Sequence, residues 1–223
     1  MQRIFHTPEG VRDIYSQECS RKQKLQEKLH RVFHQYGFED IETPTFEYFE
    51  VFSKEVGTIP SRELYKFFDR EGNTLVLRPD FTPSVSRACA TYFNPEKEVV
   101  SLCYTGNTFI NNSSFRGRLK ETTQMGVERM GDDSPEADAE ILAMTVECLL
   151  ATGLTEFQVS VGQVDYYKAI FAQTGLSQEE EEELRELISQ KNYFGVEELV
   201  KNKNMDKSLA RVLSQLPQMF GST

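Results

Sequence analysis

The segment 118–128 carries polar side chains in a pattern that could form a binding surface. If the segment is a strand, Gln124, Gly126 and Glu128 share one face with Thr122, because successive side chains of a strand point to opposite sides of the sheet. A glycine between an amide and a carboxylate leaves room for a small molecule to approach the backbone. The same pattern is also typical of a solvent-exposed sheet face, and periodicity alone favours that simpler interpretation.

A second group of polar residues lies where a strand is expected to lead into a helix. The run from Leu77 to Thr82 contains Asp80 as well as the threonine. Such junctions often hold ligands, but Asp and Thr are also common as turn and capping residues. We expect a helix over about 83–92 with Thr82 as its N-cap. By itself this run does not establish a site.

Two of the three histidines and the cysteines are the candidate metal ligands. His30 and His34 have the spacing of a helical metal pair, but they lie off the apolar stripe of their expected helix and lack the glutamate of an H-E-x-x-H motif. We therefore interpret both as solvated. The cysteines are Cys19, Cys89, Cys103 and Cys148. They form no C-x-x-C pair, so we expect buried reduced thiols, no metal and no cofactor.

The elements that must position these residues follow from hydrophobic periodicity and turn signals. The expected helices span residues 16–36, 83–92, 134–152, 166–173, 178–190, 196–202 and 207–215. The expected strands or extended segments span residues 41–52, 65–69, 74–78, 99–110, 118–130 and 157–161. Two hairpins are predicted, with turns at 70–73 and 111–117. The acidic run 179–183 is interpreted as the start of a helix, where carboxylates are favoured by the dipole.

Composition limits the class of protein. The chain has 223 residues and a formal net charge of −10, with 39% hydrophobic and 27% charged residues, which is an ordinary globular balance. It contains no long apolar run that could cross a membrane and no signal peptide at its start, so we expect a soluble, cytoplasmic protein. Its acidity disfavours a nucleic-acid partner, for which the short cluster 116–120 is the only basic candidate.

Several motifs together resemble the core of class II histidyl-tRNA synthetases. They are T-P-E-G-V-R-D at 7–13, L-R-P-D-F-T at 77–82, Y-T-G at 104–106, and G-R at 117–118 leading to Q-M-G-V-E at 124–128. Their order and spacing are similar to those of the family over roughly residues 5–165. The resemblance implies an α+β fold, a class II synthetase-like antiparallel sheet flanked by helices.

The resemblance places the ATP clamp of the family at positions that have lost it. In that family the first strand of the second motif ends in Phe-Arg, the arginine grips the α-phosphate of ATP, and a glutamate follows two residues later. An ungapped match puts Phe109, Ile110 and Asn112 at these positions. Isoleucine offers neither charge nor donor, where a charge-assisted bond contributes about 1.5–3 kcal/mol. Arg116 is the alternative cation, but its offset places it elsewhere on the hairpin.

The amino-acid side of the pocket is better preserved. The residues that hold histidine in the family match Thr82, Gln124 and Glu128, and a glutamate of that pocket corresponds to the shorter Asp80. Two carboxylates and an amide suit a zwitterionic amino acid, because a desolvated ammonium group needs paired acceptors. The glycine that follows in the family is Phe81 here, which puts the affinity and identity of the ligand in question.

A chain that keeps the synthetase framework but lacks the clamp resembles one group in particular, the regulatory subunits of ATP phosphoribosyltransferase. Later segments resemble them more loosely, at 162–164, 172–177, 190–193 and 197–199. The resemblance implies a protein without catalytic residues that binds and activates the short-form catalytic subunit in the first step of histidine biosynthesis and helps mediate histidine feedback. It also implies a homodimer, formed around residues 16–52, inside a hetero-oligomer, with histidine as a ligand.

Two other functions remain open at this point. A divergent histidyl-tRNA synthetase would use Arg116 in place of the missing clamp. A synthetase-like RNA or amino-acid sensor would bind no phosphoribosyltransferase, and the acidity disfavours it. We expect residues 1–163 to form the first part of the synthetase-like core and 164–223 a small helical segment. Since 216–221 resembles the interior of a domain, we expect the chain to end before the rest of the core.

Overall fold

The computed structural model describes residues 6–53, 59–112, 117–162, 164–203 and 205–216. The chain separates into two compact units, Met1–Phe157 and Gln158–Thr223, and each has its own core. Sequence analysis expected a change of structure near residue 164.

A long antiparallel hairpin forms the centre of the first unit. Strand β5 (Val100–Phe109) pairs with β6 (Glu121–Met130) along their whole length, in a register that places Tyr104 opposite Gly126. The hairpin predicted over these residues is therefore confirmed. The short strand β1 (Glu39–Asp40) adds to β5 in parallel, which the sequence pattern did not indicate.

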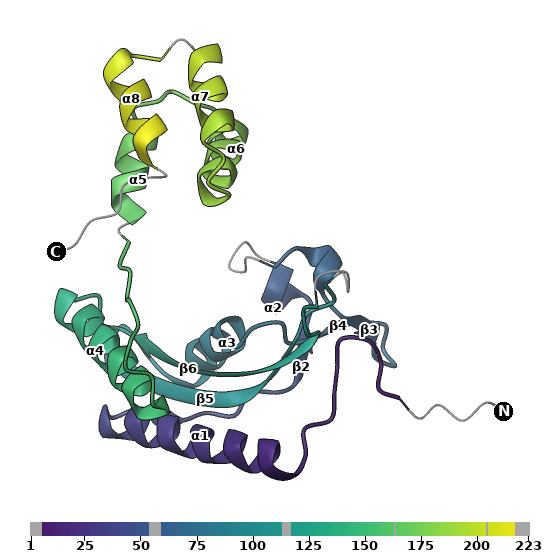
Figure 1. The fold of residues 1–223 in the computed structure, drawn as a ribbon. Coiled ribbons are helices and arrows are strands. Elements are labelled where there is room, and N and C mark those ends of the chain that lie inside the picture. Colours follow the sequence, from purple (N-terminus) through teal and green to yellow (C-terminus); the bar gives the residue numbers. More distant parts are fainter. Residues whose placement is uncertain (1–5, 54–58, 113–116, 163, 204, 217–223) are drawn as a thin grey trace. The chain divides into compact units, whose positions relative to one another are not determined.

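Helices cover both faces of this sheet (Figure 1). On one face lies α3 (Thr82–Tyr92), whose Val85 packs in one cluster with Tyr104. On the other face lie α1 (Ser16–Gln35) and α4 (Pro135–Thr152), where Cys103 packs in a second cluster. Neighbouring residues of β5 thus enter different cores, as the alternation of a strand requires.

A second antiparallel sheet in this unit has the order β2-β4-β3. Its strands are β2 (Phe46–Tyr48), β4 (Thr74–Leu77) and β3 (Lys66–Phe68). The predicted hairpin of β3 and β4 is confirmed. The extended segment expected over 41–52 is only partly correct, because the short helix α2 (Glu50–Ser53) follows β2. A single 3-10 turn, Ser61–Glu63, precedes β3.

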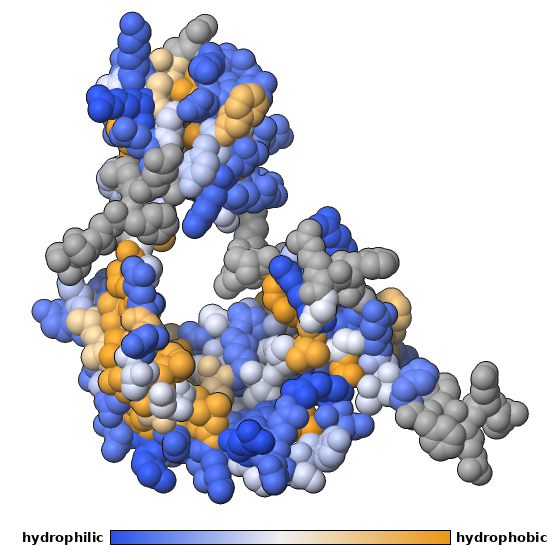
Figure 2. All heavy atoms as spheres, in the orientation of Figure 1, coloured by the Kyte–Doolittle hydropathy of each residue, from blue (hydrophilic) through white to orange (hydrophobic). Residues whose placement is uncertain are grey.

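Local capping explains where α4 begins and ends. The Ser134 hydroxyl accepts a hydrogen bond from the Ala137 amide at 3.2 Å, and Gly153 takes a left-handed φ of 98° after the last turn. Apolar side chains gather on the surface where α4 lies (Figure 2), and Leu142 and Leu150 of this helix are exposed. The helix predicted over 134–152 is confirmed.

Two local expectations are wrong. Thr82 is not an N-cap but the first residue of α3, preceded by Phe81 as the cap. Its hydroxyl is directed to Glu128 instead of to the helix backbone, so a tertiary contact overrides the local one. The alternating segment 157–161 forms no strand, because no neighbouring strand of the described residues pairs with it.

The described part of the second unit contains four helices. They are α5 (Val164–Phe171), α6 (Gln178–Ser189), α7 (Tyr193–Asn202) and α8 (Lys207–Gln215), and all were expected with small shifts of their ends. Their core contains Leu184, Val196 and Leu213, each fully buried. The acidic run does begin α6, where Ser177 and Glu180 form a capping box.

No helix in the described parts of the chain is long and apolar enough to cross a bilayer.

Alanine substitutions at two glycines distinguish backbone strain from steric overlap. Gly131 and Gly153 both have positive φ, 86° and 98°, but a Cβ atom on Gly131 would lie 2.5 Å from the Pro95 carbonyl oxygen, whereas nothing lies within 4 Å of one on Gly153. Gly153→Ala should lower the free energy of unfolding by about 1 kcal/mol through strain alone. Gly131→Ala should cost at least twice as much in urea denaturation, and equal losses would contradict the described contact.

Candidate ligand pocket

The polar face predicted on β6 lies on the side of the sheet that α3 covers. The register pairs Gly106 with Gln124, Tyr104 with Gly126 and Leu102 with Glu128, and Leu102 and Tyr104 pack in the same cluster as residues of α3. The side chains of Gln124 and Glu128 therefore extend toward the start of that helix. This arrangement places them next to the junction that carries Asp80 and Thr82.

The structure brings all four predicted pocket residues together in two hydrogen-bonded pairs. The Thr82 hydroxyl donates to Glu128 Oε1 at 2.6 Å, and the Gln124 amide donates to Asp80 Oδ1 at 3.0 Å. All four side chains are half-buried. The pairs join residues 46 and 44 positions apart in the sequence. The geometry is compatible with a binding site, and ligand binding by these residues stays a prediction.

Tyr104 is a pocket residue that sequence reasoning missed. Its buried hydroxyl donates to Glu128 Oε1 at 3.5 Å, and its ring stacks on Phe81 with centroids 4.4 Å apart and an interplanar angle of 7°. Gly126 is required for this position, because a Cβ atom there would lie 2.6 Å from Tyr104 Cζ. The sequence did contain a signal for this contact, because the predicted hairpin places an aromatic residue directly opposite a glycine.

Phe81 is buried next to the four polar residues. The side chain is 1% exposed and lies between two partners, the Tyr104 ring and the Arg78 guanidinium, whose central carbon is 4.0 Å from the Phe81 centroid. The Phe81 amide also donates to Asp80 Oδ1 at 2.8 Å. The backbone amide of residue 81, and not its bulky side chain, therefore contacts one of the two carboxylates.

Arg78 supplies a buried positive charge next to the Phe81 ring. Its guanidinium donates to the backbone carbonyls of Thr43 and Asn107, both at 2.8 Å. Burial lowers the pKa of Arg78 below its ordinary value. Gly106 makes room for the side chain, since a Cβ atom at that position would lie 2.6 Å from Arg78 Nη2. Sequence analysis quoted this arginine only as part of a motif.

The charges of the four residues are compatible with a positively charged ligand group. Burial, together with the nearby Asp80 charge, raises the pKa of Glu128, although hydrogen bonds from Thr82 and Tyr104 oppose the shift. Burial also raises the pKa of Tyr104, with Glu128 adding to the effect. Two carboxylates held close together with this much burial are stabilised by a cation between them. An ammonium group would provide that charge and donate hydrogen bonds to both.

The positions that resemble the family's ATP clamp line a neighbouring cavity of about 510 Å³. The described residues that line it are Ile59, Pro60, Glu63, Ile110, Asn112, Arg118, Leu119 and Thr122. Thr122 is also two residues from Gln124, so the two residues share a face of β6. Arg116 lies outside the described residues.

Backbone pairing holds the two clamp positions in place. The Ile110 amide donates to the Lys120 carbonyl at 2.9 Å, just beyond the regular ladder of the hairpin. The Asn112 side-chain nitrogen donates to the Leu119 carbonyl at 3.4 Å, while its buried Oδ1 has no hydrogen-bond partner in the described structure. The cavity is therefore lined at these positions by an aliphatic side chain and by an amide side chain whose oxygen is buried.

Comparisons with known proteins agree on one family. The family model described as histidyl-tRNA synthetase matches residues 10–223. A curated protein from Acetivibrio thermocellus, named ATP phosphoribosyltransferase regulatory subunit, is 43% identical over 219 residues, covering 98% of this chain and 52% of that protein. One of the same name from Ruminiclostridium cellulolyticum is 40% identical over 218 residues, with coverages of 98% and 52%. The chain spans about half the length of these curated relatives.

Solved structures give the same fold. A crystal structure described as an ATP phosphoribosyltransferase regulatory subunit/histidyl-tRNA synthetase from Bacillus halodurans has a TM-score of 0.84 and 32% identity, covering 96% of this chain and 56% of that one. The histidyl-tRNA synthetase of Nostoc sp. PCC 7120 has a TM-score of 0.78 at 18% identity, covering 99% and 50%, and supports the fold alone.

These findings confirm the predicted α+β, class II synthetase-like fold and the predicted resemblance. The chain belongs to the histidyl-tRNA synthetase family, and the curated proteins most informative about its place in that family are named ATP phosphoribosyltransferase regulatory subunits.

Proposed function

We propose that this chain is part of a non-catalytic regulatory subunit that binds and activates the short-form catalytic subunit of ATP phosphoribosyltransferase and helps mediate histidine feedback in the first step of histidine biosynthesis. The names of its curated relatives support the proposal. The observation that carries it is a contrast within one sheet face. Asp80 and Glu128 lie in two hydrogen-bonded pairs with oxygens that could accept from an amino acid, while Ile110, which the family resemblance matches to the ATP-clamp arginine, lines a cavity.

The acceptor side suits an amino acid with a free ammonium group. In the described structure, the hydrogen bonds to Glu128 both end on Oε1, and those to Asp80 both end on Oδ1. Each carboxylate thus has its second oxygen to offer to a ligand, and Gln124 carries an amide oxygen as a further acceptor. Histidine is the ligand that the family resemblance implies, and two carboxylates also suit a cationic imidazole.

We infer that the nucleotide side lacks the arginine that the family uses to activate that amino acid. Adenylation develops negative charge on a phosphate, and catalysis needs donors already aimed at it. Ile110 provides none. Arg118 is the one cation among the cavity's described lining residues, and it shares the cavity with Glu63. This arginine is the specific observation that favours a second candidate function, a divergent histidyl-tRNA synthetase.

Feedback requires more than ligand binding. A ligand shifts an equilibrium only by the difference between its affinities for the two states. We propose that histidine in the pocket favours one arrangement of a hetero-oligomer built on a homodimer. The exposed aromatic residues Phe46 and Tyr48 on β2 support a subunit contact in the 16–52 region, because large exposed apolar groups often mark interfaces.

Reconstitution with the proposed partner tests the function. The protein should associate with the short-form catalytic subunit from the same organism in gel filtration, and it should raise the initial rate of phosphoribosyl transfer. Histidine should lower the rate of the complex more than that of the catalytic subunit alone. The histidyl-tRNA synthetase of that organism is the matched control, since it has the same fold and should do neither. Absence of both association and activation would refute the proposal.

Glu128→Gln tests the pocket. The substitution keeps the size of the side chain but removes the charge that would pair with an ammonium group, so histidine should bind about 10- to 100-fold more weakly in calorimetry. Glu121→Gln is the matched control on the same strand, because Glu121 lies on the opposite face and accepts from Asn107 at 2.7 Å. Equal affinities of Glu128→Gln and the unmodified chain would place the ligand site elsewhere.

A further inference from the structure

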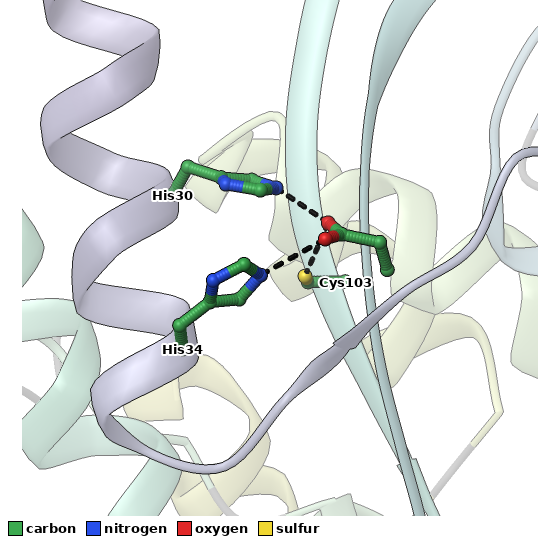
Figure 3. Close-up of side chains that lie close together, drawn as sticks. His30, His34 and Cys103 are labelled. Atoms are coloured by element: carbon green, nitrogen blue, oxygen red, sulfur yellow. Dashed lines mark hydrogen bonds and ion pairs between the residues drawn. The ribbon is translucent and has the colours of Figure 1, made fainter.

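Four potential metal ligands gather on the side of the sheet opposite the pocket. One ligand atom from each of His30, His34, Asp40 and Cys103 lies within 4.8 Å of all the others. Figure 3 shows both imidazole rings directed from their helix toward the strand that carries Cys103. The two histidines are partly exposed, as expected, but both contact Asp40, which the interpretation as solvated side chains did not include.

Three elements bring these residues together. His30 and His34 are one turn apart on α1, so they share a face of the helix. Asp40 of β1 and Cys103 of β5 are direct partners in the parallel pairing, and the Ile41 amide donates to the Cys103 carbonyl at 2.9 Å. The cluster therefore depends on regular secondary structure and not on a loop conformation.

The distances approach those of a tetrahedral zinc site. His30 Nε2 lies 2.5 Å from Asp40 Oδ1, His34 Nε2 lies 3.0 Å from Asp40 Oδ2, and Cys103 Sγ lies 3.4 Å from Asp40 Oδ1. With bond lengths of about 2.0–2.3 Å, the ligand atoms of a tetrahedral zinc ion are separated by about 3.3–3.8 Å. Small side-chain rotations that open the imidazole–carboxylate contacts would admit an ion at the centre of the four.

We propose that His30, His34, Asp40 and Cys103 bind one Zn²⁺ ion. Two imidazole nitrogens, a thiolate and a carboxylate are a ligand set that zinc accepts, whereas Ca²⁺ and Mg²⁺ require oxygen ligands almost entirely. Four protein ligands close the coordination sphere, which is typical of a structural site. Such an ion would clamp α1 to the sheet through β1 and β5.

Charge and proton balance are consistent with this assignment. The Cys103 thiol is buried in the metal-free chain and donates to Asp40 Oδ1 at 3.4 Å. When zinc binds, the S–H bond breaks, an S–Zn bond forms and the proton passes to water. The carboxylate and the thiolate then neutralise the two charges of the ion. Asp40 and both histidines are partly exposed, so the ion can enter from solvent.

Cobalt provides the direct test, because Co²⁺ replaces zinc and absorbs visible light. Titration of the metal-free chain should saturate at one Co²⁺ per chain, with the intense visible bands of a tetrahedral ion and a thiolate-to-cobalt charge-transfer band, and Zn²⁺ should displace it. Cys103→Ser should abolish the charge-transfer band, whereas Cys89→Ser, at an equally buried thiol, should retain it. Octahedral spectra, or a charge-transfer band that survives Cys103→Ser, would overturn the proposal.

A second pair of variants tests the site independently, in case the Cys103→Ser protein does not fold. The double variant His30→Asn with His34→Asn should bind Zn²⁺ more than about 100-fold more weakly in competition with a chromophoric chelator, because residues that only orient a ligand already contribute about 10- to 100-fold. His6→Asn is the control, since His6 lies outside the cluster. Zinc should also raise the melting temperature of the unmodified chain, but not that of the double variant. Equal zinc affinity of the double variant and the control would refute the site.

Discussion

The antiparallel register of β5 and β6 is the constraint on which both proposed sites depend. It places Tyr104 opposite Gly126 and Leu102 opposite Glu128, so the polar residues of β6 share a face with the start of α3. It also turns Cys103 to the other face, toward α1. Because strand side chains alternate, a slip of one residue would exchange the two faces. The polar pocket and the histidine–cysteine cluster would then both be lost.

A series of contacts between buried side chains connects Arg78 to Glu128. The Arg78 guanidinium lies under Phe81, the Phe81 ring stacks on Tyr104, and the Tyr104 hydroxyl reaches Glu128. Burial and the nearby Asp80 charge raise the pKa of Glu128, and the hydrogen bonds from Thr82 and Tyr104 oppose that shift. We infer that the family's amino-acid pocket has been kept for binding, while Ile110 removes the charge needed to activate what is bound.

Sequence reasoning succeeded where the determining interactions are local. Turn residues, the Ser134 cap and hydrophobic periodicity predicted the β5–β6 hairpin, α4 and the four small helices. The sequence-based predictions were wrong or incomplete where a residue distant in the sequence determines the contact. Thr82 bonds Glu128 instead of capping its helix, and Asp40 meets Cys103 from 63 residues away. The alternation at 157–161 predicted a strand, but a strand also needs a neighbour to pair with.

The central claim is that this synthetase-like framework binds but does not activate an amino acid. Histidine-dependent exchange of pyrophosphate into ATP tests it most directly, because exchange requires an adenylate to form and reverse. The account predicts no exchange above the level without histidine, under conditions in which the histidyl-tRNA synthetase of the same organism exchanges rapidly. Histidine-dependent exchange by the protein that carries this chain would contradict the account.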